Sequence, residues 1–212
     1  MNKEIDFKFT RPFGPMIAKV TMPNQIVEKL NTYVDKIIVD RKKVKELNYG
    51  SKLAGNVQQE FKLEKDFIET SGWGGFLTSC TNLWLQKAIN KKITKFELIS
   101  TWIVRQFQND YNPLHTHGGH ISGVGYLKVP KNLGEYSQKD KVNNKNGLLS
   151  LVHGSKMFLS DSTFNIVPQV GDFYFFPNYL MHTVYPFSNT DEERRSISFN
   201  ANIDENIYNI YS

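Results

Sequence analysis

The spacing of apolar residues changes about half-way along the chain. Between positions 25 and 38 apolar side chains recur every three or four residues, which predicts an amphipathic helix with Asn24 as its N-cap. The segment Trp73-Gly74-Gly75 is expected to break the chain, and a similar pattern over 76–90 predicts a second helix. Both apolar stripes are expected to lie against a sheet.

From Phe96 onward, apolar and polar residues alternate, which is typical of strands that bury one face. Turn signals separate these segments, and short alternations in 1–22 indicate an edge strand or two. Residues 39–66 are weakly patterned and are expected to form a loop with a short helix. The strands expected in the second half cover 96–105, 121–129, 147–152, 164–167, 172–176, 182–185 and 196–203.

Helices in the first half and many short strands in the second predict a mostly β protein, a closed or nearly closed sandwich supported by N-terminal helices. No linker or repeat divides the chain, so 1–212 is expected to be one domain. Residues 1–95 provide helical support and edge strands, and 96–203 form the core. The polar segment 131–146 has no periodicity, and a lid over a site is one role for so long a loop.

Composition indicates where the protein is located more clearly than what it does. The chain has 212 residues, a net charge of +5 and a single cysteine, Cys80, which excludes an internal disulfide framework. Neither a leader pattern nor a long apolar run is visible. We therefore expect a soluble cytoplasmic protein with no membrane partner. The mild positive charge permits a nucleic-acid partner, although no recognition motif supports one.

Three histidines are spaced as metal ligands. His115 and His117 are separated by one residue, so their rings project to the same face of an extended backbone. His182 follows a strand that ends near Pro177, where its ring could face a barrel interior. An isolated pair of this kind is more often two ordinary polar loop residues. With a distant third histidine, the pair suggests non-haem Fe(II).

The strand that begins at Arg194 carries a polar face that could bind an anion. Arg194, Ser196 and the polar residues that alternate after them share one face, and apolar residues share the other. If the apolar face packs on the helices, the polar face points into the barrel. An arginine buried there needs a counter-charge, and a dicarboxylate could supply it through the guanidinium fork, with Ser196 adding a hydrogen bond. The alternative is that Arg194 lies in water at the frayed strand end.

These segments resemble the Fe(II)/2-oxoglutarate-dependent oxygenases, specifically the prolyl-hydroxylase-like group that includes bacterial and phage proteins of unassigned substrate. The resemblance spans roughly 96–203, with the pieces in the same order and at the same spacing. They are NPLHTH at 112–117, SGVGYLKVP at 122–130, GDFYFFP at 171–177, YLMH at 179–182 and RRSISFN at 194–200.

The resemblance implies a double-stranded β-helix, the jelly-roll or cupin-like barrel, that binds Fe(II) and uses 2-oxoglutarate and O2. On this model His115 is the first metal ligand and His182 the distal one, and Arg194 and Ser196 bind the far carboxylate of 2-oxoglutarate. The family's usual second ligand is a carboxylate two residues after the first histidine. In this chain that position is His117, so the implied ligand set is three imidazoles.

Other residues are assigned weaker roles. Gln106 and Tyr126 are expected to face inward and to contact the cosubstrate or to orient a ligand. His120 and His153 are expected behind the ligands or facing the substrate, because neither has the two-residue spacing. No acidic residue between Asn112 and Lys131 replaces the missing carboxylate.

The function that follows from the resemblance is hydroxylation of an unidentified substrate with release of succinate and CO2. The substrate could be a protein side chain, a nucleotide or a small metabolite. One alternative is a three-histidine metal dioxygenase or other cupin-like metal-binding protein that does not use 2-oxoglutarate. A third is a catalytically silent barrel that serves as a binding module. If the chain is encoded by a phage, its expected location is the host cytoplasm.

Overall fold

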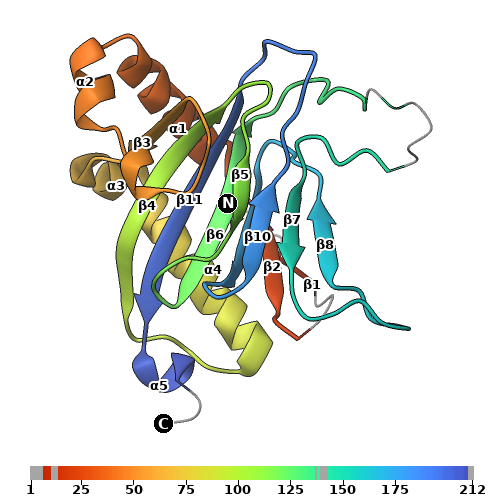
Figure 1. The fold of residues 1–212 in the computed structure, drawn as a ribbon. Coiled ribbons are helices and arrows are strands. Elements are labelled where there is room, and N and C mark those ends of the chain that lie inside the picture. The colour runs from red at the N-terminus through yellow and green to blue at the C-terminus, as the bar shows by residue number, and fades with distance from the viewer. Residues whose placement is uncertain (1–6, 11–13, 137, 139–142, 210–212) are drawn as a thin grey trace.

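The computed structural model describes residues 7–10, 14–136, 138 and 143–209. Its strands form two antiparallel sheets that face each other as a barrel, with helices outside the larger one (Figure 1). The larger sheet contains seven strands in the order β1-β2-β9-β6-β11-β4-β3, and the smaller contains four in the order β5-β10-β7-β8. The strands are β1 Phe7–Thr10, β2 Ile17–Thr21, β3 Gln59–Lys62, β4 Phe96–Gln106, β5 Asn112–His115, β6 Ile121–Lys128, β7 Leu149–Val152, β8 Thr163–Ile166, β9 Asp172–Pro177, β10 Met181–Val184 and β11 Arg194–Ile203.

Most of the helical structure precedes β4, as the sequence predicts. The helical elements are α1 Asn24–Ile38, α2 Arg41–Glu46, the short 3-10 helix η1 Gly50–Lys52, α3 Lys65–Ser71, α4 Trp73–Ile89 and the C-terminal α5 Glu205–Tyr208. In the described part of the chain, no helix combines the length and apolar character that crossing a bilayer requires.

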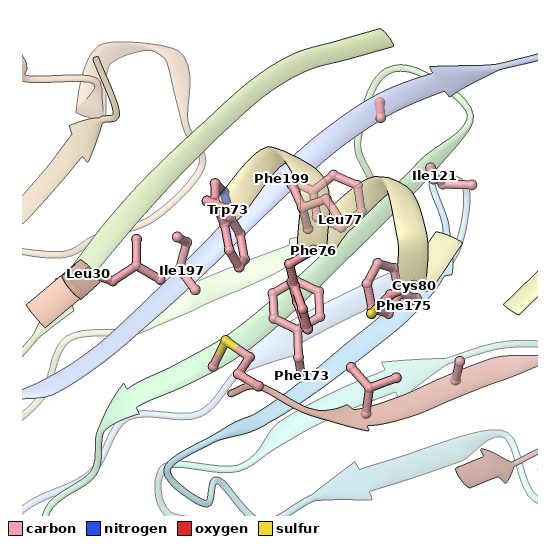
Figure 2. Packing of buried hydrophobic residues seen from close by; sticks show 14 of the residues in the cluster. Leu30, Trp73, Phe76, Leu77, Cys80, Ile121, Phe173, Phe175, Ile197 and Phe199 are labelled. Carbon is pink, nitrogen blue, oxygen red and sulfur yellow. The ribbon is translucent and has the colours of Figure 1, made fainter. Parts of the chain in front are cut away.

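The main core lies between the helices and the outer face of the larger sheet. Helix α4 places Trp73, Phe76 and Cys80 on this face, where they meet Phe173, Phe175 and Phe199 from β9 and β11 (Figure 2). The sheet can accept these rings because β6 carries Gly123 and Gly125, where a side chain would overlap the ring of Phe173. The helices thereby fix the position of β6, β9 and β11, which leaves the inner face of the same sheet free to line a site.

The predicted helices are present with two corrections to their boundaries. Trp73-Gly74-Gly75 was expected to break the chain but forms the first turn of α4. The break lies one residue earlier, at Gly72, whose φ of 87° ends α3 and suits a residue without a side chain. Asn24 is not the N-cap of α1: Pro23 occupies that position, and Asn24 is the first helical residue.

Residues 39–66 contain more structure than the expected loop and short helix. They include α2, η1 and the edge strand β3, which pairs with β4. The four residues of β3 are Gln-Glu-Phe-Lys, too short and too polar for periodicity to reveal. Pairing with the long strand β4 is what makes this segment extended.

Candidate metal centre

His115, His117 and His182 meet at one end of the barrel. The ring nitrogens that could bind an ion all lie within 4.8 Å of one another, and the Nε2 atoms of His117 and His182 are 3.1 Å apart. Two imidazole nitrogens bound to one ion at about 2.1 Å and roughly a right angle would be separated by about 3 Å. The three rings are therefore spaced to share one metal ion.

Two different parts of the barrel bring the rings together. His115 ends β5 and is the direct cross-strand partner of His182, which is the second residue of β10. His117 lies two residues beyond β5, and the turn after β9 holds it: the His117 N–H donates to the carbonyl of Asn178 at 3.1 Å, and the Asn178 amide donates back to the His117 carbonyl at 3.3 Å.

The backbone also sets the tautomer of two of the rings. Nδ1 of His115 lies 2.7 Å from the carbonyl of Pro113, and Nδ1 of His182 lies 2.9 Å from that of Leu180. A carbonyl only accepts, so each Nδ1 carries the proton and each Nε2 keeps its lone pair. Such an anchored imidazole is the usual form of a metal-binding histidine.

The electrostatic surroundings favour neutral rings. Burial, with a smaller contribution from the neighbouring imidazoles, lowers the pKa of His117 to about 3 and that of His182 to about 4. Both rings are therefore uncharged at neutral pH. A metal ion needs that state, because a protonated imidazole has no free lone pair.

Arg194 and Ser196 lie on β11 in the wall of the same pocket that the three histidines line. Arg194 is 1% exposed. It donates one hydrogen bond from Nη1 to the carbonyl of Gly147 at 3.2 Å, and its Nε has no partner among the described residues. No carboxylate in the described part of the chain pairs with it. The alternative of a frayed, solvated arginine is therefore wrong, and the guanidinium is a buried cation without a counter-ion.

Gln106 and Tyr126, which were expected to face inward, lie at different places relative to the pocket. Gln106 is the cross-strand partner of Arg194, lines the pocket and donates from Nε2 to the side chain of Asn112 at 2.8 Å. Tyr126 is fully buried, its ring centroid lies 5.3 Å from the Arg194 guanidinium, and its hydroxyl has no hydrogen-bond partner among the described residues. It does not line the pocket, so it backs Arg194 and does not face the cavity.

His120 and His153 do not join the cluster. The His120 ring stacks on Tyr208 of α5 at 4.0 Å, accepts from the Ile203 N–H and approaches Glu205. The expectation that it lies behind the ligands or faces the substrate is wrong, because the C-terminal helix covers it. His153 follows β7, and Cε1 of its ring lies 3.6 Å from where a side chain on Gly14 would begin.

Sequence reasoning missed three residues that shape the site. Trp102 lines the pocket with its ring 5.6 Å from that of His117. Asn112 lines it from β5, and Asn178 fixes the His117 backbone. The sequence does contain a signal for Trp102, because it shares the alternating face of β4 with Gln106, which is expected to face inward.

The described flanks of the proposed lid contact the segment before β11 and lead to a residue that binds Arg194. Ser188, between β10 and β11, donates its N–H to the carbonyl of Leu133, and Asn144 donates to the carbonyl of Gly134. Gly147, just beyond this segment, accepts from Arg194. Residues 137 and 139–142 lie outside the described part, and a lid stays a prediction.

Comparison with known families identifies the core that carries this site. Residues 100–200 match a family model described as "Putative 2OG-Fe(II) oxygenase". This segment is similar in sequence to the 2OG-Fe(II) oxygenases. The match contains all three histidines of the cluster together with Arg194 and Ser196, and it spans the core strands from β4 to β11. No curated protein matches the chain significantly by sequence.

Solved structures of 2OG-Fe(II) oxygenases share the fold across most of the chain. A prolyl-4-hydroxylase from Pseudomonas putida is 16% identical over 87% of this chain and 91% of its own, with a TM-score of 0.55. The viral collagen prolyl hydroxylase of Paramecium bursaria Chlorella virus-1, in complex with 2OG, is 14% identical over 87% and 94%, with a TM-score of 0.54. HygX from Streptomyces hygroscopicus, with nickel and 2-oxoglutarate bound, is 12% identical over 86% and 80%, with a TM-score of 0.52. The predicted double-stranded β-helix is confirmed.

Proposed function

We propose that the chain is an Fe(II)- and 2-oxoglutarate-dependent dioxygenase that hydroxylates a C–H bond, with release of succinate and CO2. One observation carries the proposal: a single pocket is lined by three converging imidazoles and by a buried guanidinium that no carboxylate of the described residues neutralises. A metal site alone would not need the guanidinium, and an anion site alone would not need the imidazoles.

His115, His117 and His182 are the proposed ligands of Fe(II). They fit the ion because their ring nitrogens converge, two of them have fixed tautomers and all offer the borderline nitrogen donors that iron accepts. The pairing of β5 with β10 fixes the positions of the His115 and His182 rings. Asn178 keeps His117 in place by its two contacts with the His117 backbone.

Arg194 and Ser196 are the proposed binding groups for the far carboxylate of 2-oxoglutarate. The free Nε of Arg194 and its buried charge fit a carboxylate, because burying that charge without a counter-ion is unfavourable. Ser196, two residues along the same strand face, supplies a hydroxyl donor. Gln106 orients Asn112 at the pocket wall, and the Tyr126 ring packs against the guanidinium as a backing surface.

The chemistry that bound Fe(II) supplies with 2-oxoglutarate and O2 is oxidative decarboxylation of the diacid coupled to hydroxylation of a substrate C–H bond. The chain's own residues fix positions and exclude water. Trp102, Phe176 and Val184 provide apolar walls around the polar groups of the pocket, and charged groups interact more strongly in such a shielded site.

The third imidazole distinguishes this site from the pattern that the resemblance implies. Three neutral ligands leave a divalent ion with its full charge of two, whereas two imidazoles and a carboxylate reduce that charge by one. We propose that His117 replaces the usual carboxylate as a functional ligand, since its ring lies within the cluster and its pKa keeps it neutral.

The three-imidazole set also favours a second candidate, a metal dioxygenase of the same fold that does not use 2-oxoglutarate. The buried Arg194 argues against it, because such an enzyme leaves the guanidinium without a partner. One of the solved structures is named a collagen prolyl hydroxylase, and another is a prolyl hydroxylase in complex with a hypoxia-inducible-factor peptide fragment. For this chain a protein side chain, a nucleotide and a small metabolite all remain candidate substrates.

Succinate formation tests the proposal. The purified protein is incubated with Fe(II), 2-oxoglutarate and O2, with and without candidate substrates, beside Arg194→Gln and the control His153→Ala. We expect 2-oxoglutarate to be consumed by the wild type and the control, and not by Arg194→Gln. A metal-loaded wild type that neither binds nor consumes 2-oxoglutarate would favour the second candidate.

A further inference from the structure

Glu60 on β3 is a buried carboxyl that the proposed chemistry does not use. Its side chain is 3% exposed, and its Oε1 has no hydrogen-bond partner in the described part of the chain. Burial raises the pKa of this carboxyl to about 7. A buried acid without a partner costs stability, so its presence calls for a reason beyond packing.

The register of the larger sheet places Glu60 on the pocket side. Glu60 is paired with Val104 on β4, Val104 with Ser196 on β11, and Ser196 with Tyr126 on β6. Directly paired residues project to the same face, and Val104 and Ser196 both line the pocket. Neighbouring strands lie about 4.8 Å apart, so the Glu60 backbone is about 10 Å from that of Ser196.

The end of the Glu60 side chain points toward the pocket wall. A side-chain carbon on Gly55 would lie 2.9 Å from Glu60 Oε1 and 2.8 Å from the amide nitrogen of Asn112. Glu60 Oε1 and Asn112 therefore border the same small space, which the absence of a side chain at Gly55 leaves free. Asn112 lines the pocket and accepts from Gln106, the partner of Arg194.

The charged groups around Glu60 do not neutralise it. On β4, Arg105 faces the other side of the sheet and pairs with Glu193. On β5 the titratable group is His115. On β11, Arg194 lies on the pocket side, whereas Arg195 lies on the other face and pairs with Asp35 and Glu193. In the segment next to Glu60, a side-chain carbon on Gly50 would lie 3.4 Å from Oε2; Tyr49 precedes this glycine, and Lys52 lies two residues after it. Among the described residues, no cation forms an ion pair with Glu60.

We propose that Glu60 sets the charge of the cosubstrate end of the pocket and is a specificity residue for the dianion bound there. This inference rests on the proposed function. The protonated carboxyl adds no charge to the wall, so Arg194 attracts a dicarboxylate unopposed. The ionised carboxylate places a negative charge on the same sheet face, two strands from Ser196, and opposes a dianion.

The size of the effect follows from the distance. A unit charge about 10 Å from another, at the effective dielectric constant of about 20 that describes protein sites, changes the binding constant by roughly tenfold or more. Raising the pH from 6 to 8 ionises Glu60, while the carboxylic acids of 2-oxoglutarate are already ionised at pH 6. We therefore expect affinity for 2-oxoglutarate to fall with rising pH.

The test is calorimetric titration of 2-oxoglutarate into anaerobic, metal-saturated protein at pH 6 and pH 8. In the wild type we expect the Kd to rise about tenfold between these values. Glu60→Gln has nearly the same shape and no titratable proton, and its Kd should change much less. Glu60→Met provides a second neutral variant if the amide disturbs folding. Glu46→Gln, an exposed acid on α2, is the matched control and should behave as the wild type.

Equal dependence of the Kd on pH in the wild type and both neutral variants would overturn the role of Glu60 and leave the proposed function intact. A wild-type Kd that does not change with pH would do the same. If no protein binds 2-oxoglutarate at either pH, the proposed function fails and this inference fails with it.

Discussion

His115 and His182 face each other directly across β5 and β10, with their ring centroids 4.3 Å apart. The register of two strands therefore fixes the separation of two proposed metal ligands. A slip by one residue would turn one ring to the outside of the barrel. The site thus depends on the pairing of the smaller sheet as much as on the residues themselves.

Removing one of these ligands should abolish metal binding. We expect His182→Ala to purify with little or no bound metal after equilibration with Fe(II), because two imidazoles leave the ion with an incomplete ligand set. His153→Ala, outside the cluster, should retain the wild-type content. Elemental analysis of the three proteins measures this, and equal metal in the wild type and His182→Ala would exclude His182 as a ligand.

Metal binding should survive replacement of His117 by a carboxylate better than replacement by a methyl group. His117→Asp introduces the ligand that the resemblance leads one to expect there, so we expect it to keep metal binding. His117→Ala should bind metal at least tenfold more weakly, because the ion loses a donor. Metal titrations of both variants followed by calorimetry measure the difference. Similar affinity of His117→Ala and the wild type would show that His117 is not a ligand.

The affinity for 2-oxoglutarate should depend both on the positive charge of Arg194 and on the forked shape of its guanidinium. A hydrogen bond to a charged group contributes about 1.5–3 kcal/mol, so Arg194→Gln should weaken 2-oxoglutarate binding by about 10- to 100-fold. Arg194→Lys keeps the charge without the fork and should lie between that variant and the wild type. Ser196→Ala should have a smaller effect, roughly fivefold. Calorimetry on metal-loaded protein measures all three, and unchanged affinity in Arg194→Gln would contradict the assignment.

Glu60 should make the stability of the metal-free protein depend on pH. Its carboxyl has a pKa of about 7 in the folded chain and about 4.3 when unfolded. Between these values the folded state binds more protons, so the free energy of unfolding falls as the pH rises. Relative to Glu60→Gln, the wild type should lose about 3 kcal/mol between pH 4 and pH 8. Urea unfolding of both proteins measures this, and parallel pH profiles would show that Glu60 titrates normally.

Regular periodicity explains which parts of the fold the sequence predicts. The three-and-four spacing of α1 and the alternation of β11 are long enough to identify both elements. The same alternation correctly predicts that Arg194 is buried, because the apolar face of β11 has only the helices to cover it. Trp73-Gly74-Gly75 misleads because local glycine content says little about a helix whose stability comes from packing Trp73 and Phe76 against the sheet.

Elements that depend on distant partners are invisible to the same reasoning. The edge strand β3 forms by pairing with the edge of β4 that β11 leaves open, so neither β3 nor Glu60 attracts attention in the sequence. The position of His120 is decided by α5, which stacks Tyr208 on its ring. The positions of the three histidines in the sequence predict the cluster. Only the β5–β10 register and the Asn178 contacts explain how its rings come together.

The most direct test of the central claim is anaerobic titration of 2-oxoglutarate into the Fe(II) protein, followed by visible absorption, with Arg194→Gln measured in parallel. If the imidazoles hold iron and Arg194 holds the diacid in one pocket, the wild type develops a new absorption band that saturates, and Arg194→Gln requires far more 2-oxoglutarate to reach it. An iron-loaded wild type whose spectrum does not change with 2-oxoglutarate would contradict the claim.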